Sequence, residues 1–377
     1  MAEHNKSTQY YKPYTYNQII THHLKILKSL QYESGLFSAS KKDSTTGYNK
    51  SWLRDNFYET LAFDVIGDSS TIKKTYKAIL RIFLKHEYKI NYAIASKPKY
   101  RHEYIHARFH PVTFDEYWEE WGNKQNDSIG AILYGIGKLE NEGIKTKERV
   151  KTAVKTAIKI IETPDEKRIV QKLVWYLSTL QYWHDEDSGM WEEDEEIHAS
   201  SIGACVAGLE MIKKVKGIKV HPRLIKKGHA VLNKLLPRES KKKFVDLALL
   251  SLIWPYDVVS IPQAKDLLKN VEYHLVKKRG VIRYKNDHYY NKNPDRYSEE
   301  AEWTFGFSWL AIIYNKLGDK KKAKYYENLA MSTVTPEGTL PELYFSNSKK
   351  YNENNPLGWS ESLFIVALHE INMKHAK

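Results

Sequence analysis

The sequence predicts an all-α fold, an (α/α)6 double barrel in which six helical hairpins form an inner and an outer ring. Apolar residues recur at spacings of three and four along most of the chain, whereas strand-like alternation is scarce. In addition, short motifs that combine aromatic and polar residues recur roughly 40 to 70 residues apart, about once every two helices. If the helical hairpins stand in a ring, all of these motifs fall on one rim.

Helical periodicity is found in thirteen segments. They are residues 14–30, 51–66, 70–86, 126–140, 147–161, 166–180, 197–213, 222–236, 245–253, 262–276, 302–317, 319–331 and 359–371. Pro164 and Pro222 mark helix starts, while Gly67, Gly217 and Gly318 lie just past helix ends. Residues 88–120 and 279–299 carry little periodicity, and we expect them to be long loops that form walls around the rim.

The recurring motifs precede alternate helices and are the main functional signal. They are Trp52-Leu53-Arg54-Asp55, Lys124-Gln125-Asn126-Asp127, Trp191-Glu192-Glu193, Trp254-Pro255-Tyr256-Asp257, Glu300-Ala301-Glu302-Trp303 and Pro341-Glu342-Leu343-Tyr344, the last leading into Leu357-Gly358-Trp359. Acidic residues favour the first turn of a helix, but that preference does not explain the Trp, Arg and Gln beside them. We therefore expect one cleft at the rim, within a single domain over residues 1–377 whose first 13 residues form a flexible tail.

The composition of the chain limits the kinds of partner that we expect for it. The net charge of +13 resides mainly in lysines at helical spacing, such as Lys213, Lys214 and Lys216, which predicts solvated outer faces and no nucleic-acid partner. No apolar stretch reaches the length of a membrane span, and the polar first residues do not resemble a signal peptide. The single cysteine, Cys205, lies in an apolar run and is expected to be inert core. We expect a soluble, cytoplasmic protein with no membrane partner, and the sequence leaves the oligomeric state open.

Two glutamates on the rim suit acid–base cleavage of a glycosidic bond. Such a reaction needs a protonated carboxyl for the leaving oxygen and a carboxylate on the opposite face of the sugar. Glu192 follows Trp191 within the acidic stretch 185–196, where like charge and an aromatic wall would favour its protonated form. Glu342 follows Pro341, and its candidacy depends on sharing the rim with Glu192.

Five segments in order resemble the blocks of glycoside hydrolase family 15, which holds glucoamylases, glucodextranases and related enzymes. They are residues 48–55 (YNKSWLRD), 121–127 (WGNKQND), 191–193 (WEE), 283–284 (RY) and 341–342 (PE), and Pro356-Leu357-Gly358-Trp359-Ser360 resembles the turn that opens the last inner helix. The resemblance runs from about residue 45 to 368. It implies an inverting, exo-acting hydrolase that releases β-glucose from short α-glucosides such as maltooligosaccharides or isomaltooligosaccharides.

The resemblance also implies residue roles. Glu192 matches the general acid and Glu342 the general base that activates water. The residues matched to substrate binding are Tyr48 beside the water, Trp52 as an apolar wall, Arg54 and Asp55 on the hydroxyls of the terminal glucose, Trp121 and Trp191 near the acid, Glu193 and Arg283 on the leaving side, and Lys124, Gln125 and Asp127 in the same wall. Inversion implies carboxyl groups roughly 6.5 to 9.5 Å apart.

The resemblance implies no metal and no organic cofactor. His184 and His198 flank Glu192 but are expected to be hydrogen-bonding partners rather than ligands. Because about 45 residues precede the first block, we expect neither an N-terminal β-sandwich domain nor a starch-binding module, which favours short substrates over polymeric starch. The linkage (α-1,4, α-1,6 or that of trehalose) depends on loop shape.

Three alternatives stay open at this point. A disaccharide phosphorylase on the same barrel needs only the acid, and Glu342 argues against it. A catalytically silent carbohydrate-binding regulatory domain, like the glucoamylase-like region of phosphorylase kinase subunits, shares the fold and some of the blocks. A basic helical repeat that binds nucleic acid would explain the charge, but carboxylates on the rim would repel phosphates.

Overall fold

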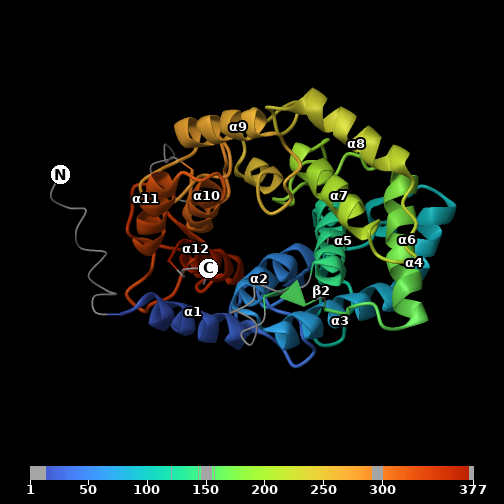
Figure 1. Cartoon of the computed structure of the whole chain (residues 1–377), viewed down its shortest axis with the longest axis horizontal. Helices are drawn as coiled ribbons and strands as arrows, with labels where there is room; N and C mark the ends of the chain where they lie inside the picture. The colour runs from blue at the N-terminus through green and yellow to red at the C-terminus, as the bar shows by residue number, and fades with distance from the viewer. Residues whose placement is uncertain are drawn as a thin grey trace.

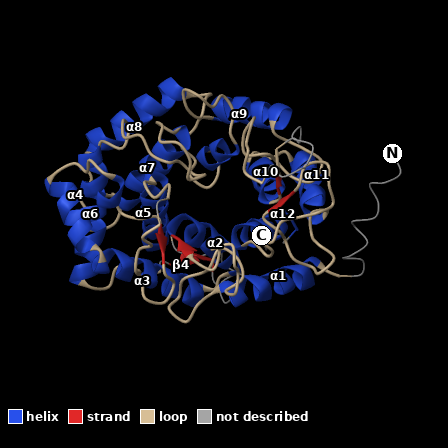
Figure 2. Ribbon diagram, turned by 180° about the vertical axis from the view of Figure 1, so that it is seen from behind, coloured by secondary structure: helices blue, strands red, loops and turns tan. Residues whose placement is uncertain are grey.

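Two concentric rings of helices organise the molecule, a computed structural model that describes residues 14–119, 121–142, 144–145, 155–156, 158–290 and 300–372 (Figures 1 and 2). The inner ring consists of α2 (Leu53–Ile66), α5 (Asn126–Asn141), α7 (Ala199–Ile212), the 3-10 helix η4 (Leu247–Leu252), α10 (Phe305–Lys316) and α12 (Gly358–Asn372). Each inner helix contacts the next one in chain order, and α12 contacts α2. The inner ring is therefore closed, as the sequence predicts.

The outer ring surrounds these helices. It contains α1 (Tyr16–Leu30), α3 (Ser69–Lys85), α4 (Glu87–Ala95), α6 (Pro164–Leu180), α8 (Pro222–Leu235), α9 (Ile261–His274) and α11 (Lys320–Met331) (Figure 1). Each outer helix precedes an inner one, so the chain alternates between the two rings. All inner helices consequently begin at the same end of the barrel, which we call the mouth.

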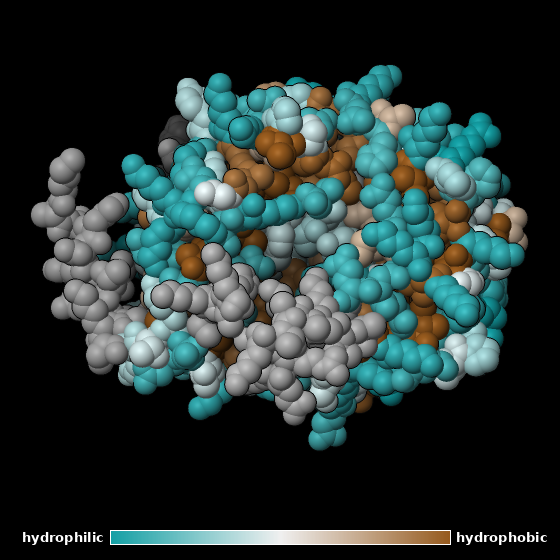
Figure 3. All heavy atoms as spheres, in the orientation of Figure 1, coloured by the Kyte–Doolittle hydropathy of each residue, from teal (hydrophilic) through white to brown (hydrophobic). Residues whose placement is uncertain are grey.

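The residues of each ring fit its position. In α10 every side chain from Phe305 to Tyr314 is buried, as expected for a helix with neighbours on all sides. In α8 burial is restricted to Leu224, Ile225, Gly228 and Leu232, a single stripe at helical spacing. Hydrophilic side chains accordingly dominate the outline of the face in Figure 3, and apolar residues appear between them.

The inner helices α5 and α7 approach each other closely because three glycines line their contact. A Cβ atom at Gly130 would lie 2.4 Å from the backbone of Ala204, and one at Gly208 would lie 2.4 Å from the carbonyl oxygen of Gly130. Gly137 meets the backbone of Met211 in the same way. A larger residue at these positions would force the two helices apart.

Short antiparallel ladders fix the loops at the mouth. Strand β1 (Ser51–Trp52) pairs with β2 (Arg108–Phe109), and β5 (Glu302–Trp303) pairs with β6 (Leu343–Tyr344). Thr304 strengthens the second ladder, because its hydroxyl donates to the carbonyl oxygen of Pro341 at 2.5 Å. The second ladder thereby holds the segments before α10 and α12 in register, while the first ties the segment before α2 to residues 108–109.

The helix predicted over residues 147–161 is wrong within the described residues. Strands β3 (Ile144–Lys145) and β4 (Lys155–Thr156) pair there, residues 158–161 are not helical, and residues 146–154 and 157 lie outside the description. The sequence holds a competing signal, since β-branched residues alternate with other residues from Val150 to Ile160. The described residues of this segment therefore follow the strand period of two rather than the helical period of 3.6.

The expected loop 88–120 also differs, because it contains part of α4, the 3-10 turn η2 (Arg101–Glu103) and β2. In the second loop, residues 291–299 lie outside the described residues, as do residues 1–13. The helix expected over 245–253 is present as η4, a 3-10 helix. Within the described part of the chain, no helix is long and apolar enough to span a membrane.

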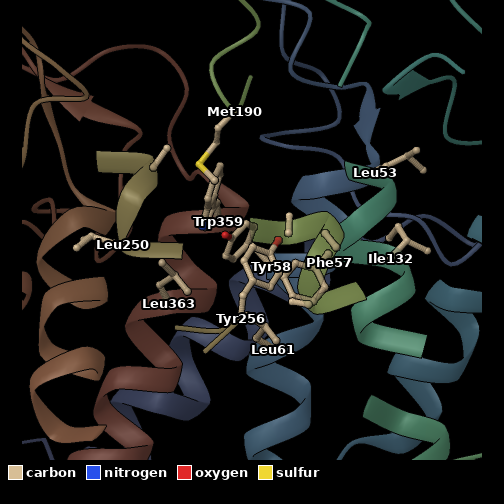
Figure 4. Packing of buried hydrophobic residues seen from close by; sticks show 14 of the residues in the cluster. Leu53, Phe57, Tyr58, Leu61, Ile132, Met190, Leu250, Tyr256, Trp359 and Leu363 are labelled. Atoms are coloured by element: carbon tan, nitrogen blue, oxygen red, sulfur yellow. The ribbon is translucent and has the colours of Figure 1, made fainter. Parts of the chain in front are cut away.

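The motif Trp254-Pro255-Tyr256-Asp257 does not lie at the mouth, contrary to the prediction. It follows η4 instead of preceding an inner helix, and the carbonyl oxygen of Trp254 accepts from Trp309 Nε1 at 2.8 Å. Tyr256 is buried and stacks on Phe57 with ring centroids 6.0 Å apart. Figure 4 shows Tyr256 on the far side of Tyr58 from Met190, where it fills the barrel beneath the mouth.

Candidate active site

A cavity of about 80 Å³ that opens to solvent lies at the mouth of the barrel. Its walls come from the loops that lead into the inner helices and from the first turns of α2 and α12. The lining residues are Ala39, Tyr48, Trp52, Arg54, Asp55, Trp121, Met190, Trp191, Glu192, Arg283, Tyr289, Trp303, Glu342, Leu357 and Trp359. Both predicted catalytic glutamates and seven of the predicted binding residues therefore meet in one pocket.

Glu192 lies in the loop between α6 and α7 in a constrained conformation. Its backbone φ is +64°, a left-handed value that is rare outside glycine and is found where surrounding structure imposes it. Gly122 packs against this backbone so closely that a Cβ would lie 2.4 Å from the carbonyl oxygen of Glu192. The position of Glu192 is thus set by the loop before α5 as well as by its own.

Three donors orient the Glu192 carboxylate. Oε1 accepts from Arg54 Nη2 at 3.2 Å and from Gln125 Nε2 at 2.9 Å, and Oε2 accepts from Trp121 Nε1. Behind them, Arg54 Nη1 donates to Gln125 Oε1 at 2.6 Å and to Asp127 Oδ2 at 3.2 Å. Gln125 and Asp127 do not line the cavity. They hold the arginine and the glutamate in place from beneath.

Glu342 is buried next to β6 and is bound by a different set of donors. Its Oε1 accepts from the Tyr48 hydroxyl at 2.8 Å, and its Oε2 accepts from Asn352 Nδ2 at 2.5 Å and from Asn354 Nδ2 at 2.7 Å. Burial raises the pKa of Glu342 above its usual value, while the bonds from Asn354, Tyr48 and Asn352 lower it. The carboxylate is held rigidly with little access to bulk water.

The pKa of Asp55 depends on the charges of both glutamates. Burial raises its pKa to about 7, Arg54 acts to lower it, and the charges of Glu192 and Glu342 raise it further. Because Asp55 lines the cavity, its carboxyl is available to a ligand rather than consumed by a protein ion pair. Three carboxyl groups therefore share one weakly solvated site.

Aromatic rings supply the remaining surface. Trp359 stacks on Phe305 with ring centroids 4.8 Å apart and on Tyr58 at 4.3 Å. The indole nitrogens of Trp303 and Trp359 are buried and have no partner within the described part of the chain. The pocket thus has flat apolar walls, which suit the faces of sugar rings.

Arg283 forms the outer wall through an ion-pair network. Its Nε donates to Asp287 Oδ2 at 2.6 Å, and its Nη2 donates to Glu193 Oε1 at 2.9 Å. Glu193 also accepts from the Tyr284 hydroxyl at 2.7 Å and from Lys243 Nζ at 2.8 Å. Glu193 does not line the cavity, so it lies behind Arg283 rather than in the wall itself.

Lys124 lies outside the pocket, contrary to its predicted place among the substrate-binding residues. Its ammonium sits over the ring of Tyr104 at 4.5 Å and lies 3.5 Å from Asp185 Oδ1 and 3.6 Å from Glu195 Oε2. The acidic stretch 185–196 is therefore neutralised by cations, including Arg101 at 2.6 Å from Glu195. Like charge does not crowd Glu192 in the way the sequence suggested.

Several site residues were missed from the sequence. Tyr289, Asn352 and Asn354 come from long loops without periodicity, and only the spacing of two between the asparagines signalled that both could face one carboxylate. The Arg108 guanidinium was also missed. It packs over the rings of Trp121 at 4.5 Å and Trp52 at 5.6 Å, and its Nη2 donates to Glu119 at 2.7 Å. Arg108 thus supports two walls at once.

The two histidines that flank Glu192 and the single cysteine do not line the pocket. His198 is buried with Nδ1 3.3 Å from Glu239 Oε1, and although burial acts to lower its pKa, Glu239 and Asp187 raise it to about 9. His184 is exposed beside Trp183, with ring centroids 6.2 Å apart, and no group of three or more metal-ligating side chains occurs among the described residues. Cys205 is buried, and burial raises the pKa of its thiol well above the usual value, as expected for inert core.

Regulatory subunits of a kinase are among the known proteins whose sequences are similar to this chain. A regulatory subunit α of phosphorylase b kinase from Caenorhabditis elegans is 26% identical over 66% of this chain, and one from Drosophila melanogaster is 25% identical over 93%. The matched regions are 23% and 32% of those proteins, so the chain spans about a quarter to a third of the length of these relatives.

Solved structures share the fold. A wild-type glycosidase superposes with a TM-score of 0.75 at 16% identity over 94% of this chain and 96% of its own. Glucoamylase from Saccharomycopsis fibuligera gives a TM-score of 0.71 at 14% identity over 95% and 94% of the two chains. The model of the glycosyl hydrolases family 15 matches residues 14–368, and the chain therefore belongs to this family.

Proposed function

We propose that the pocket binds the terminal glucose of a short α-glucoside, and that Glu192 and Glu342 hydrolyse its glycosidic bond with inversion, releasing β-glucose. The observation that carries the proposal is that two glutamates from segments 150 residues apart line one aromatic cavity, each fixed by its own set of donors. A pair of separately held carboxyl groups is what an inverting glycosidase requires.

In this mechanism Glu342 is the general base. Asn352 and Asn354 occupy Oε2, so Oε1, beside the Tyr48 hydroxyl, is the oxygen that faces the cavity and takes a proton from the attacking water. Glu192 donates its proton to the leaving oxygen on the opposite face of the sugar. Arg54 and Trp121 then stabilise the carboxylate that forms.

Sugar recognition follows from the free polar groups of the pocket. Asp55, which lines the cavity, accepts from hydroxyls of the terminal glucose. Arg283, backed by Glu193 and Asp287, lies on the leaving side.

The sequence comparison favours a second candidate function. The curated relatives reported above are regulatory subunits of a kinase, so the chain is also a candidate for a domain that binds carbohydrate without turnover and acts on protein partners. The pocket geometry supports sugar binding in either case. The two candidates differ in whether the carboxyl pair turns substrate over.

Turnover and binding must therefore be measured together. The chain is incubated with maltose, isomaltose, trehalose and maltotriose, with and without phosphate, while glucose and glucose phosphate are quantified. Calorimetry measures binding of the same sugars to Glu192→Gln. Phosphate-independent glucose release by the unchanged chain supports hydrolysis, glucose phosphate would indicate a phosphorylase, and binding without turnover would establish the regulatory candidate.

A further inference from the structure

A strongly basic surface lies on the outer ring, in a segment that the pocket does not use. Residues 213–243 contain twelve Lys and Arg and a single acidic residue, a net charge of +11 in a chain whose net charge is +13. That acidic residue, Glu239, is buried and accepts from the Ser200 hydroxyl at 2.5 Å. Lys242 pairs with Asp194 and Glu196, and Lys243 pairs with Glu193, so the unbalanced charge of the segment lies toward its start.

The densest part of this surface is the turn between α7 and α8. We call it the α7–α8 basic cluster, and it consists of the exposed residues Lys167, Lys213, Lys214, Lys216, Lys219, Arg223 and Lys226. Lys167 belongs to α6, which neighbours α8 on the outer ring (Figure 1), and a Cβ at Gly217 would lie 2.1 Å from its Nζ. Two segments distant in sequence thus bring their cations together.

In the described part of the chain, the members of the cluster have no carboxylate partner, unlike several other lysines of the outer ring. Lys77 lies 2.6 Å from Glu166, Lys172 lies 2.7 Å from Glu87, and Lys322 lies 2.8 Å from Glu272. Among the ion pairs of the described residues, none within 4.0 Å involves a member of the cluster. Its mutual repulsion is therefore uncompensated, and the turn projects a strong positive field into solvent.

We propose that the α7–α8 basic cluster binds an acidic segment of a partner protein. Six of its seven cations are lysines, compact charges that pair singly with carboxylates, as they do across the outer ring of this same chain. Proteins that bind single-stranded nucleic acid add aromatic stacking. The exposed Trp175 of α6 lies one turn beyond Gln171, which accepts from the backbone N–H of Lys219, so an oligonucleotide is the competing ligand in the test below. A membrane-surface site would expose large apolar side chains, whereas Ile218 at the centre of the turn is buried.

The test uses fluorescent poly-L-glutamate as the probe and the full chain as the protein. The triple variant Lys213→Glu, Lys216→Glu, Lys226→Glu reverses the cluster. The matched control, Lys265→Glu, Lys269→Glu, Lys321→Glu, makes the same charge change at exposed, unpaired lysines of α9 and α11. We expect the cluster variant to weaken binding by about tenfold or more and the control by about twofold or less, with a steep salt dependence in the unchanged chain.

The unchanged chain and the two triple variants must have the same thermal unfolding midpoint. If a Lys→Glu triple variant does not fold, the Lys→Gln triple variant at the same three positions replaces it. Equal weakening by cluster and control variants, or no weakening by either, would overturn the proposal. Tighter binding of a single-stranded oligonucleotide or of phosphatidylserine vesicles than of poly-L-glutamate would overturn the choice of partner. Sugar turnover in the pocket is measured in parallel and should be the same in all three proteins.

Discussion

At the scale of single residues, the site depends on how each glutamate is held. Glu342 is buried and takes all of its hydrogen bonds from Tyr48, Asn352 and Asn354, whereas Glu192 is bound by Arg54, Gln125 and Trp121. The two sets share no residue. Each carboxyl can therefore have its own protonation behaviour although both face one cavity.

Replacement of either glutamate by glutamine should remove the acid or the base and preserve the shape of the pocket. We expect Glu192→Gln and Glu342→Gln each to lower kcat by about two orders of magnitude or more. The control is Asp194→Asn, which lies two residues from Glu192 with a side chain 86% exposed and should keep full activity. Near-normal rates in both glutamine variants would contradict the assignment.

The donors to Glu342 should control the acid side of the pH profile. Glu342 acts as a base when ionised, so kcat/KM falls as the pH drops through its pKa, which burial raises and the asparagine bonds lower. Removing one donor in Asn354→Leu should raise that pKa and move the acid limb to higher pH. Asp55 also lines the cavity and burial raises its pKa as well, so the shift of the acid limb between the two proteins, rather than its absolute position, reports on Glu342. An unchanged acid limb would exclude Glu342 as the titrating base.

At the scale of helices, glycines allow α5 and α7 of the inner ring to pack closely. Gly130 is one of these glycines, and we expect Gly130→Ala to lower the free energy of unfolding by about 1–3 kcal/mol because the two backbones must separate. Urea denaturation checks this, with Asn328→Ala at an exposed site of α11 as the control. A variant as stable as the unchanged chain would show that the helices can shift without loss.

Most helices could be predicted from the sequence because apolar spacing, proline and glycine agree, as around Pro164 and Gly67. The helix prediction over 147–161 failed because the spacing of its apolar and β-branched residues fits both the helical period and the strand period. The failure at Trp254–Asp257 has a different origin, since a short 3-10 helix shifted the motif to the far end of η4. Local pattern specifies an element but not the end of the barrel that it reaches.

The site was predictable only where its residues are adjacent in sequence. Arg54 and Asp55 share the first turn of α2, and both line the pocket. Lys124 was misplaced because the loop before α5 turns its side chain outward to Asp185. Asn352 and Asn354 reach Glu342 through a loop whose path depends on tertiary contacts, which no local pattern encodes.

At the scale of the whole molecule, a buried pair links the two rings near the base residue. His23 of α1 bonds Glu361 of α12 through Nδ1, and Glu361 Oε1 accepts from the backbone N–H of Leu340 at 2.8 Å. Both side chains are fully buried. The outer ring is therefore tied to the segment that carries Glu342.

Loss of this link should affect the entire barrel. We expect Glu361→Ala to lower the free energy of unfolding by about 2–4 kcal/mol, since it leaves the His23 ring and the Leu340 N–H buried without this partner. Chemical denaturation measures the change, and Glu33→Ala, at an exposed site just after α1, is the control. Equal stability of the two variants would show that the pair is dispensable for the fold.

The stereochemistry of the first product tests the central claim most directly. Proton NMR follows the anomeric signals of glucose during the first minutes of hydrolysis, before mutarotation mixes the two forms. The account predicts β-glucose as the initial product from at least one of maltose, isomaltose, trehalose and maltotriose. Initial release of the non-reducing-end glucose of maltotriose as the α-anomer, or no glucose from any of the four sugars under conditions where they bind, would contradict it.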